Sequence, residues 1–196
     1  MTTRNNIVGK IDWWLLLMYL ALVIIGVSTI YAAAYNENHP NIFDMSQHYG
    51  KQALFLGVSL FMGLLIMLID AKFFNTFAYV IYGLSIFSLL YVLVAGSTIA
   101  GSKSWIQFGG FSFQPSEFAK FGTALAVAHY LGHINTDFSK LKTQMIAYAM
   151  VLFPMMFVLM QGDTGSSLVF LVFILVFYRE GMSGNILLLG LAAVTL

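Results

Sequence analysis

Residues 13–34, WWLLLMYLALVIIGVSTIYAAA, decide the fold class of this chain. These 22 residues carry no charged side chain, and about 20 apolar residues suffice to cross the hydrocarbon core of a bilayer as a helix. The alternative is a secretory signal peptide, because Arg4 and Lys10 precede the stretch and Ala32-Ala33-Ala34 resembles a cleavage site. The apolar core of a signal peptide spans only about 7–15 residues, so the length favours a retained membrane helix.

The composition of the whole chain agrees with this interpretation. Of its 196 residues, 60% are hydrophobic and 9% are charged, whereas soluble domains average about 45–50% and 25%. Nine Lys and Arg against eight Asp and Glu give a net charge of +1, which argues against nucleic-acid binding and against an acidic tail. The chain has no cysteine, which excludes disulfides, cysteine-bound zinc and iron–sulfur clusters.

Further apolar stretches follow the first, and we expect each to form a membrane helix. Strand-like alternation at the spacing of a membrane barrel does not occur, so the sequence predicts an all-α polytopic bundle. The expected complete spans, about six in number, are residues 13–34, 53–69, 73–95, the shorter 117–131, 143–160 and 166–178.

A seventh apolar run covers residues 186–196 and is only eleven residues long. Half a span leaves backbone groups without partners in hydrocarbon, unless the helix continues or the segment is re-entrant. We therefore expect residues 1–196 to form a single integral membrane domain that is the N-terminal part of a longer protein.

The positive charges predict the orientation of the spans. An N-terminus in the cytoplasm leaves only Lys51 and Lys103 outside, which agrees with the positive-inside rule. Loops 35–50, 96–116 and 161–165 then face outward. The six cations placed on the cytoplasmic side are Arg4, Lys10, Lys72, Lys140, Lys142 and Arg179.

The start of the fourth expected helix carries an unusual pair of charges. Proline is favoured at the first helical position, which makes Gln114 the N-cap and puts the Glu117 carboxylate near free backbone N–H groups. Lys120 faces the positive end of the helix dipole, an unfavourable place, but Glu117 lies one turn away and can neutralise it. Because an ionisable residue at membrane depth costs about 2.5–3.5 kcal/mol on insertion scales, the pair is a candidate functional site.

This fourth helix has about 15 residues and is therefore roughly 22 Å long. Its start is then recessed below the outer surface, where a helix N-terminus with a lysine suits an anionic group such as a phosphate. A plain buried ion pair is the alternative. The same face continues through Ala124, Val127, Ala128 and Leu131. Its small members would allow another helix to approach closely.

Loop 96–116 itself contains a predicted hairpin. Residues 105–108 and 111–114 flank Gly109-Gly110, a typical two-residue turn, and Lys103 lies at the entrance. The aromatic side chains of this hairpin suit the membrane interface, so a simple anchor is the alternative to a functional element. These aromatic residues are Trp105, Phe108, Phe111 and Phe113.

Two further positions carry polar side chains near the ends of spans. Asp163 lies on the same expected side as loop 96–116, and it either caps the sixth helix or joins the site. His129 and His133 have the spacing of helical zinc pairs. Gly132 interrupts them and no carboxylate lies between them, so the sequence predicts no metal site there.

Two stretches resemble the hallmarks of the SEDS family, which acts in shape, elongation, division and sporulation. GSKSWI at 101–106 and FQPSEFAK at 113–120 resemble its tryptophan-containing outer loop and its Gln-Pro-Ser-Glu-x-x-Lys helix start. QGDTGS at 161–166 is similar to its Gln-Pro-Asp-x-Gly-Ser/Thr motif. The span pattern is compatible over the whole chain, and Phe113 with the compact loop is more similar to the elongation branch than to the division branch.

Two positions depart from the pattern of the family. Ser104 stands where an arginine usually precedes the loop tryptophan, and we expect Lys103 to supply the charge from a different direction. Gly162 replaces the usual proline, which loosens the turn that aims Asp163.

The resemblance implies a ten-span glycosyltransferase of the bacterial cytoplasmic (inner) membrane. Such a protein polymerises lipid II with a class B penicillin-binding protein and other elongation-complex membrane proteins as partners, and a divalent cation as cofactor is compatible with it. The catalytic aspartate of the family is expected beyond Leu196, so no catalytic residue is assigned and the piece alone is expected to be inactive. The residues expected to bind substrate are Lys103, Trp105, Gln114, Ser116, Glu117, Lys120 and Asp163.

Two other functions remain compatible with the sequence. A lipid II flippase would also need several spans, a charged pair in the membrane and a recessed helix start. A scaffold could bind the transmembrane helix of a partner through the small residues Gly57, Gly63 and Gly83. No P-loop, dinucleotide-binding glycine motif or nucleophile elbow is present, so nucleotide hydrolysis is not expected.

Overall fold

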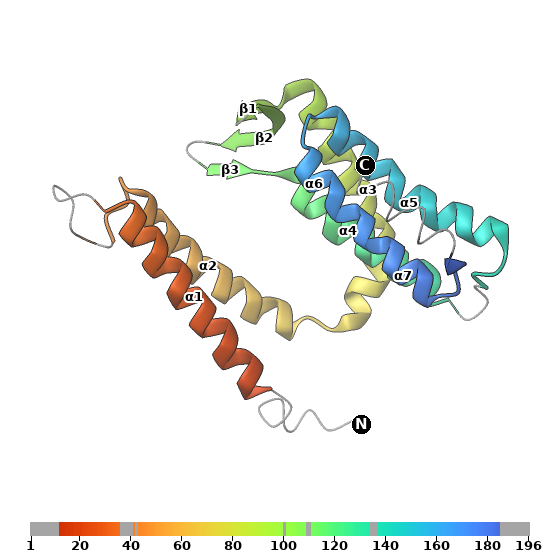
Figure 1. The fold of residues 1–196 in the computed structure, drawn as a ribbon, viewed down its shortest axis with the longest axis horizontal. Coiled ribbons are helices and arrows are strands. Elements are labelled where there is room, and N and C mark those ends of the chain that lie inside the picture. The colour runs from red at the N-terminus through yellow and green to blue at the C-terminus, as the bar shows by residue number, and fades with distance from the viewer. Residues whose placement is uncertain are drawn as a thin grey trace. The chain divides into compact units, whose positions relative to one another are not determined.

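The computed structural model describes residues 12–35, 41, 43–99, 101–108, 111–133 and 137–184. The chain forms two compact units, Met1–Ile69 and Asp70–Leu196. The first contains helices α1 and α2, and the second contains the remaining helices and a small sheet (Figure 1). The prediction of one integral membrane domain concerns the whole chain and stays a prediction.

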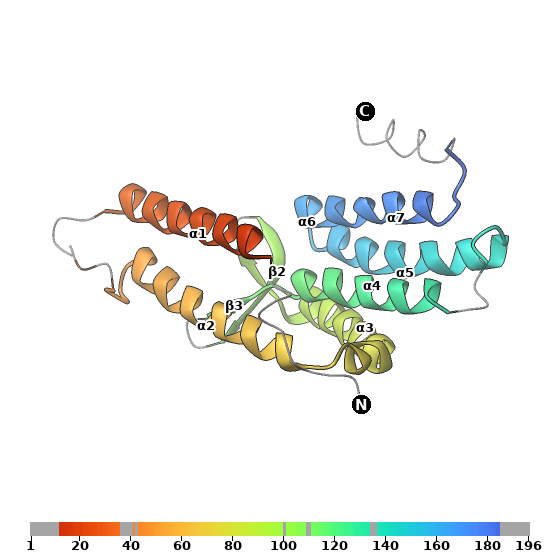
Figure 2. The ribbon, with the colours of Figure 1, turned by 90° about the horizontal axis from the view of Figure 1, so that it is seen from below.

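The first unit is a pair of antiparallel helices that lie side by side (Figures 1 and 2). Helix α1 spans Trp13–Ala33 and begins where the Asp12 carboxylate accepts a hydrogen bond from the Leu15 N–H at 3.1 Å. Helix α2 spans His48–Leu68 and therefore starts five residues before the expected span at residue 53. Hydropathy locates the part of a helix that suits hydrocarbon, and α2 continues past that part through polar residues.

The second unit is built on helices that pack in chain order, α3 on α4 and α4 on α5 (Figure 2). Helix α3 spans Ala71–Ala95 and is capped by Asp70, whose carboxylate accepts from the Lys72 N–H at 2.9 Å. Helix α4 spans Pro115–Leu131 and α5 spans Leu141–Met160. The last helical segments are α6, the short 3-10 turn η2 and α7, at Thr164–Val169, Phe170–Val172 and Phe173–Arg179.

Four helices of the described chain, α1, α2, α3 and α5, are long and apolar enough to cross a membrane. Helix α4 has 17 residues and the apolar helix Thr164–Arg179 is likewise shorter than these four, so their crossing of the bilayer stays a prediction. The expected seventh run, 186–196, lies outside the described residues. The predicted fold class is confirmed: this is a multi-pass, helical membrane protein.

One small antiparallel sheet interrupts the helices, with the strand order β1-β2-β3. Strands β2, Ser102–Phe108, and β3, Phe111–Phe113, form the predicted hairpin, with Phe108 opposite Phe111. Strand β1, Ser97–Ile99, was not predicted, because it follows α3 after a single glycine and resembles the end of that apolar run. The sheet connects the C-terminal end of α3 to the start of α4.

The face of α4 that packs inward differs from the expected one. Ala124 and Ala128 are exposed, so the expected face was wrong at these two positions, whereas Val127 is buried and Leu131 packs half-buried against the core. Helix α3 approaches instead at Gly122, where an added Cβ would lie 2.8 Å from Ser85 Oγ and 3.3 Å from Tyr82 Cα. The inward side chains are small or carry a single hydroxyl, and they are Pro115, Ser116, Ala119, Gly122, Thr123, Ala126 and Val127.

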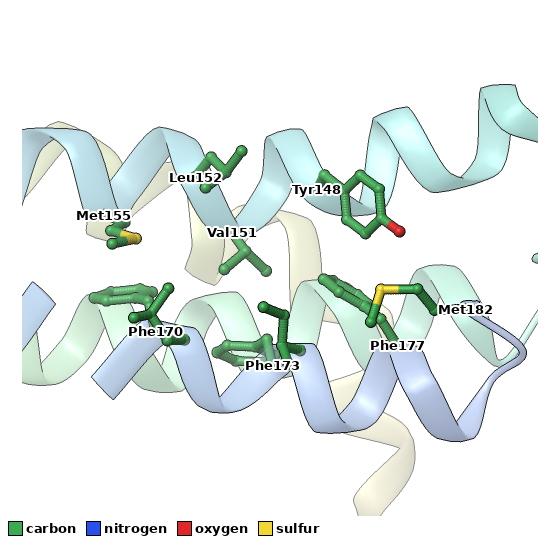
Figure 3. Close-up of a pocket in the computed structure, with 10 residues that line it drawn as sticks. Tyr148, Val151, Leu152, Met155, Phe170, Phe173, Phe177 and Met182 are labelled. Atoms are coloured by element: carbon green, nitrogen blue, oxygen red, sulfur yellow. The ribbon is translucent and has the colours of Figure 1, made fainter. Parts of the chain in front are cut away.

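Helix α5 and the α6–α7 helix enclose an apolar pocket of about 180 Å³. Figure 3 shows Phe170 facing Met155 of α5, and Phe177 facing Tyr148 of the same helix. Val151, Phe170 and Phe177 are buried at this contact and belong to the hydrophobic core of the unit.

Candidate functional site

The two motifs singled out in the sequence meet at the N-terminal ends of α4 and α6. Gln114 is the N-cap residue of α4 and Pro115 is its first residue, as predicted. The Gln114 side chain does not cap its own helix. Its Nε2 donates to Asp163 Oδ2 at 2.7 Å, across a separation of 49 residues, and lies 3.4 Å from Ser166 Oγ.

Asp163 has a partner for each carboxylate oxygen. Oδ1 accepts from the Ser166 N–H at 3.0 Å and so caps α6, while Oδ2 accepts from Gln114. The two interpretations of Asp163, helix cap and member of the site, therefore both describe its geometry. With both oxygens engaged, this carboxylate is placed to hold the two helix starts together.

The residue before Asp163 explains how this aspartate is aimed. Gly162 has a φ of +77°, in the left-handed region that favours glycine. Proline is fixed near φ −65° and cannot adopt this conformation. The glycine that departs from the SEDS pattern therefore directs the backbone along a path that the usual proline would not permit.

Glu117 and Lys120 form the predicted ion pair. Lys120 Nζ lies 2.8 Å from Glu117 Oε1, and the lysine side chain is 23% exposed against 57% for the glutamate. A fully buried ion pair does not fit, because the carboxylate remains accessible. The more enclosed ammonium lies in the first turns of α4, close to the positive end of the helix dipole.

Lys103 makes contacts of a different kind. Its Nζ donates to the carbonyl oxygens of Leu93 at 3.1 Å and Val94 at 2.9 Å, in the last turn of α3. Its backbone N–H donates to the Gln161 carbonyl at 2.9 Å. Lysine is favourable at the C-terminal end of a helix, so Lys103 ties β2 to the ends of α3 and α5. Its expected role in substrate binding stays a prediction.

Three other positions of the outer loop and helix start are placed by the fold. Ser104, where the family usually has arginine, is fully buried with its Oγ 2.8 Å from Ser102 Oγ. Trp105 is half-buried on β2 opposite Ser97. Ser116 is fully buried, and its Oγ has no hydrogen-bond partner among the described residues.

Sequence reasoning missed Ser166 and Gln161. Ser166 lies three residues after Asp163, and its backbone N–H donates to the capping carboxylate. This spacing is typical of helix N-caps and was the available signal. Gln161 is buried and its Nε2 donates to the Leu89 carbonyl at 3.1 Å, which joins α5 to α3. An amide at the end of an apolar span was the signal for this second residue.

Comparisons with known proteins identify the family of the chain. The model of the FtsW/RodA/SpoVE family, described as cell cycle proteins, matches residues 12–196. The peptidoglycan glycosyltransferase RodA of Treponema pallidum is 35% identical over 170 residues, covering 86% of this chain and 38% of that protein. The chain thus spans roughly half, or less, of the length of the curated relatives it matches.

Two solved structures share the fold. The crystal structure of the rod shape determining protein RodA of Thermus thermophilus has a TM-score of 0.80 at 29% identity, covering 95% of this chain and 59% of that one. The second structure is of a peptidoglycan synthase complex and concerns the structural coordination of polymerization and crosslinking. It has a TM-score of 0.78 at 29% identity, covering 95% of this chain and 53% of that one. The chain therefore belongs to the FtsW/RodA/SpoVE family of cell cycle proteins, the SEDS family, and is RodA-like.

Proposed function

We propose that the whole protein is a peptidoglycan glycosyltransferase of the bacterial cytoplasmic membrane that polymerises lipid II during cell elongation. The observation that carries the proposal is the 2.7 Å contact between Gln114 and Asp163, which joins the two motifs into one polar site at the start of α4, the helix that carries Lys120. The names of the relatives, peptidoglycan glycosyltransferases of the RodA type, support the same activity. With the N-terminus in the cytoplasm, the site faces the outer side of the membrane, where lipid II is polymerised.

The reaction transfers the sugar of a donor to an acceptor hydroxyl, with undecaprenyl pyrophosphate as the leaving group. It needs a base for the hydroxyl proton and positive charge for the pyrophosphate. Lys120, in the first turns of α4, is suited to the pyrophosphate, because the helix dipole adds to its charge. Glu117 holds this lysine, while Gln114, Ser116 and Asp163 orient the sugars, and the base lies beyond Leu196.

The partner that we propose is a class B penicillin-binding protein, which crosslinks the glycan that the whole protein makes. The similarity to a peptidoglycan synthase complex supports this pairing. A divalent cation at the pyrophosphate is compatible with the charge of the substrate, and it would assist Lys120 by neutralising the leaving group.

The direct test is polymerisation of labelled lipid II by the purified whole protein in detergent, with and without a transpeptidase-only partner. Long glycan from the whole protein and none from residues 1–196 is the expected result. No product from a folded preparation would reject the enzyme. Movement of labelled lipid II across sealed vesicles would then identify a flippase, and partner crosslinking without either activity would identify a scaffold.

Replacing Glu117 with alanine is expected to reduce both folding and activity, because Lys120 loses its only ion-pair partner in the described structure. We expect polymerisation to fall about tenfold, which corresponds to about 1.4 kcal/mol of transition-state stabilisation, together with a lower membrane yield. The measurement is glycan synthesis per milligram of folded protein.

The matched control for Glu117→Ala is Glu180→Ala, which removes the 3.4 Å contact with Arg179 at the opposite end of the α6–α7 helix. This control should retain polymerisation. Normal yield and normal polymerisation in Glu117→Ala would refute the role of the pair in the site.

A further inference from the structure

The C-terminal end of α4 borders a second polar site, remote from the motifs along the helix. A pocket of about 340 Å³ is lined by Asn75 of α3 together with Ala128, His129, Gly132 and His133 of the α4 end. Two of the four histidines of the chain therefore share one accessible pocket. The glycosyltransferase mechanism uses none of these side chains.

The first imidazole is held in one orientation by α3. His129 Nδ1 lies 2.5 Å from Asn75 Oδ1, and the ring packs edge-on against Tyr79 with 4.9 Å between ring centroids. An amide oxygen only accepts, so the proton is on Nδ1 and the lone pair of Nε2 is available. A ring nitrogen that donates to an oxygen while the other stays free is the arrangement of a metal-binding histidine.

The second imidazole, that of His133, lies close enough to His129 for both rings to bind one metal ion. The rings of His129 and His133 have centroids 5.9 Å apart and are inclined at 88°. Two imidazole nitrogens at about 2.0–2.1 Å from a shared ion place their ring centroids roughly 5 Å apart. His133 is exposed and lies just after Gly132, the C-cap of α4, so a movement of about 1 Å brings it into position.

The charge of this end of the helix favours a cation. The last carbonyl groups of α4 form the negative end of the helix dipole, and the pocket adjoins them at Gly132. The described residues contain no group of three or more His, Cys, Asp or Glu side chains, so water completes the coordination. Two imidazoles without carboxylates select a borderline transition ion and disfavour Mg²⁺ and Ca²⁺, which prefer oxygen ligands.

We propose that His129 and His133, with Asn75 as the residue that orients His129, bind a divalent transition-metal ion of the Zn²⁺ type. The bound ion would connect the end of α4, through His129, to Asn75 of α3. The proposal is independent of the glycosyltransferase activity. It reverses the expectation from the sequence, which could not show that α3 supplies a partner for His129 Nδ1.

The test is Zn²⁺ binding by the whole protein, purified without a polyhistidine tag and titrated against a chromogenic chelator. We expect one site that weakens about tenfold or more in His129→Ala and in His133→Ala. Loss of an orienting partner typically costs about 10–100-fold in affinity, so Asn75→Ala should weaken the site and Asn75→Asp should restore or tighten it.

A spectroscopic measurement makes the result independent of protein yield. Bound Cu²⁺ should show two coupled imidazole nitrogens in the wild type and one in either histidine variant. His39→Ala, which removes a histidine from another part of the chain, is the matched control and should leave the site unchanged. Unchanged Zn²⁺ affinity in His129→Ala, or an equal loss in His39→Ala, would overturn the proposal.

Discussion

Replacing Asp163 with alanine is expected to lower the free energy of unfolding of the second unit by about 3 kcal/mol and to abolish glycan synthesis. The variant loses the N-cap of α6, worth about 1 kcal/mol, and a charge-assisted hydrogen bond, worth about 1.5–3 kcal/mol. It also leaves Gln114 Nε2 without its 2.7 Å partner in a half-buried place. The measurement is the apparent melting temperature in detergent, followed by polymerisation of labelled lipid II.

A double-mutant cycle separates the two contacts of Asp163. Asp163→Asn keeps an acceptor for the Ser166 N–H but can no longer offer a second oxygen to Gln114. Gln114→Ala removes the same contact from the other side, so the double variant should be no less stable than the weaker single variant. Additive losses would show that Gln114 and Asp163 act separately.

The matched control for the cap is Asp70→Ala. Asp70 caps α3 through the Lys72 N–H at 2.9 Å, and among the described residues its carboxylate has no contact resembling that of Asp163 with Gln114. We expect about 1 kcal/mol of destabilisation and normal polymerisation from this variant. An equal loss of activity in Asp70→Ala and Asp163→Ala would assign the effect to folding alone.

The residues of the candidate site could be predicted from the sequence more readily than the contacts between them. Gln114, Glu117 and Lys120 were identifiable because helix-start rules and the spacing of one turn act over a few residues. The contact of Gln114 with Asp163 joins positions 49 residues apart, and no local rule predicts it. The same limit hid the Asn75–His129 contact, because each residue taken alone resembles an ordinary polar helix end.

The fold was predictable where hydropathy decides it and less so elsewhere. Long uncharged runs predicted α1, α3 and α5 to within two residues, because only apolar residues suit hydrocarbon. The inward face of α4 was predicted correctly at Val127 and Leu131 but wrongly at Ala124 and Ala128, since the charged residues from which the face was extended do not lie on the packing surface. That surface depends on the shape of α3, which the sequence of α4 alone does not contain.

This dependence on shape gives the second large effect, at Gly122. Replacing Gly122 with leucine is expected to cost about 3 kcal/mol, at the upper end of the usual cost of overpacking. Even a single Cβ would lie 2.8 Å from Ser85 Oγ and 3.3 Å from the backbone Cα of Tyr82, so α3 and α4 must separate. Their separation moves the start of α4, and polymerisation should fall together with the apparent melting temperature.

Gly83→Leu is the matched control for Gly122→Leu, because it makes the same change in α3 where nothing lies within 4 Å of an added Cβ. This variant should be as stable as the wild type, or more stable by up to about 1 kcal/mol, because glycine is a poor helix former. Adding Ser85→Ala to Gly122→Ala should recover part of the loss, since it removes the 2.8 Å contact and leaves the 3.3 Å backbone contact. If Gly122→Leu and Gly83→Leu were equally stable, the close approach of α3 to α4 would not support the site.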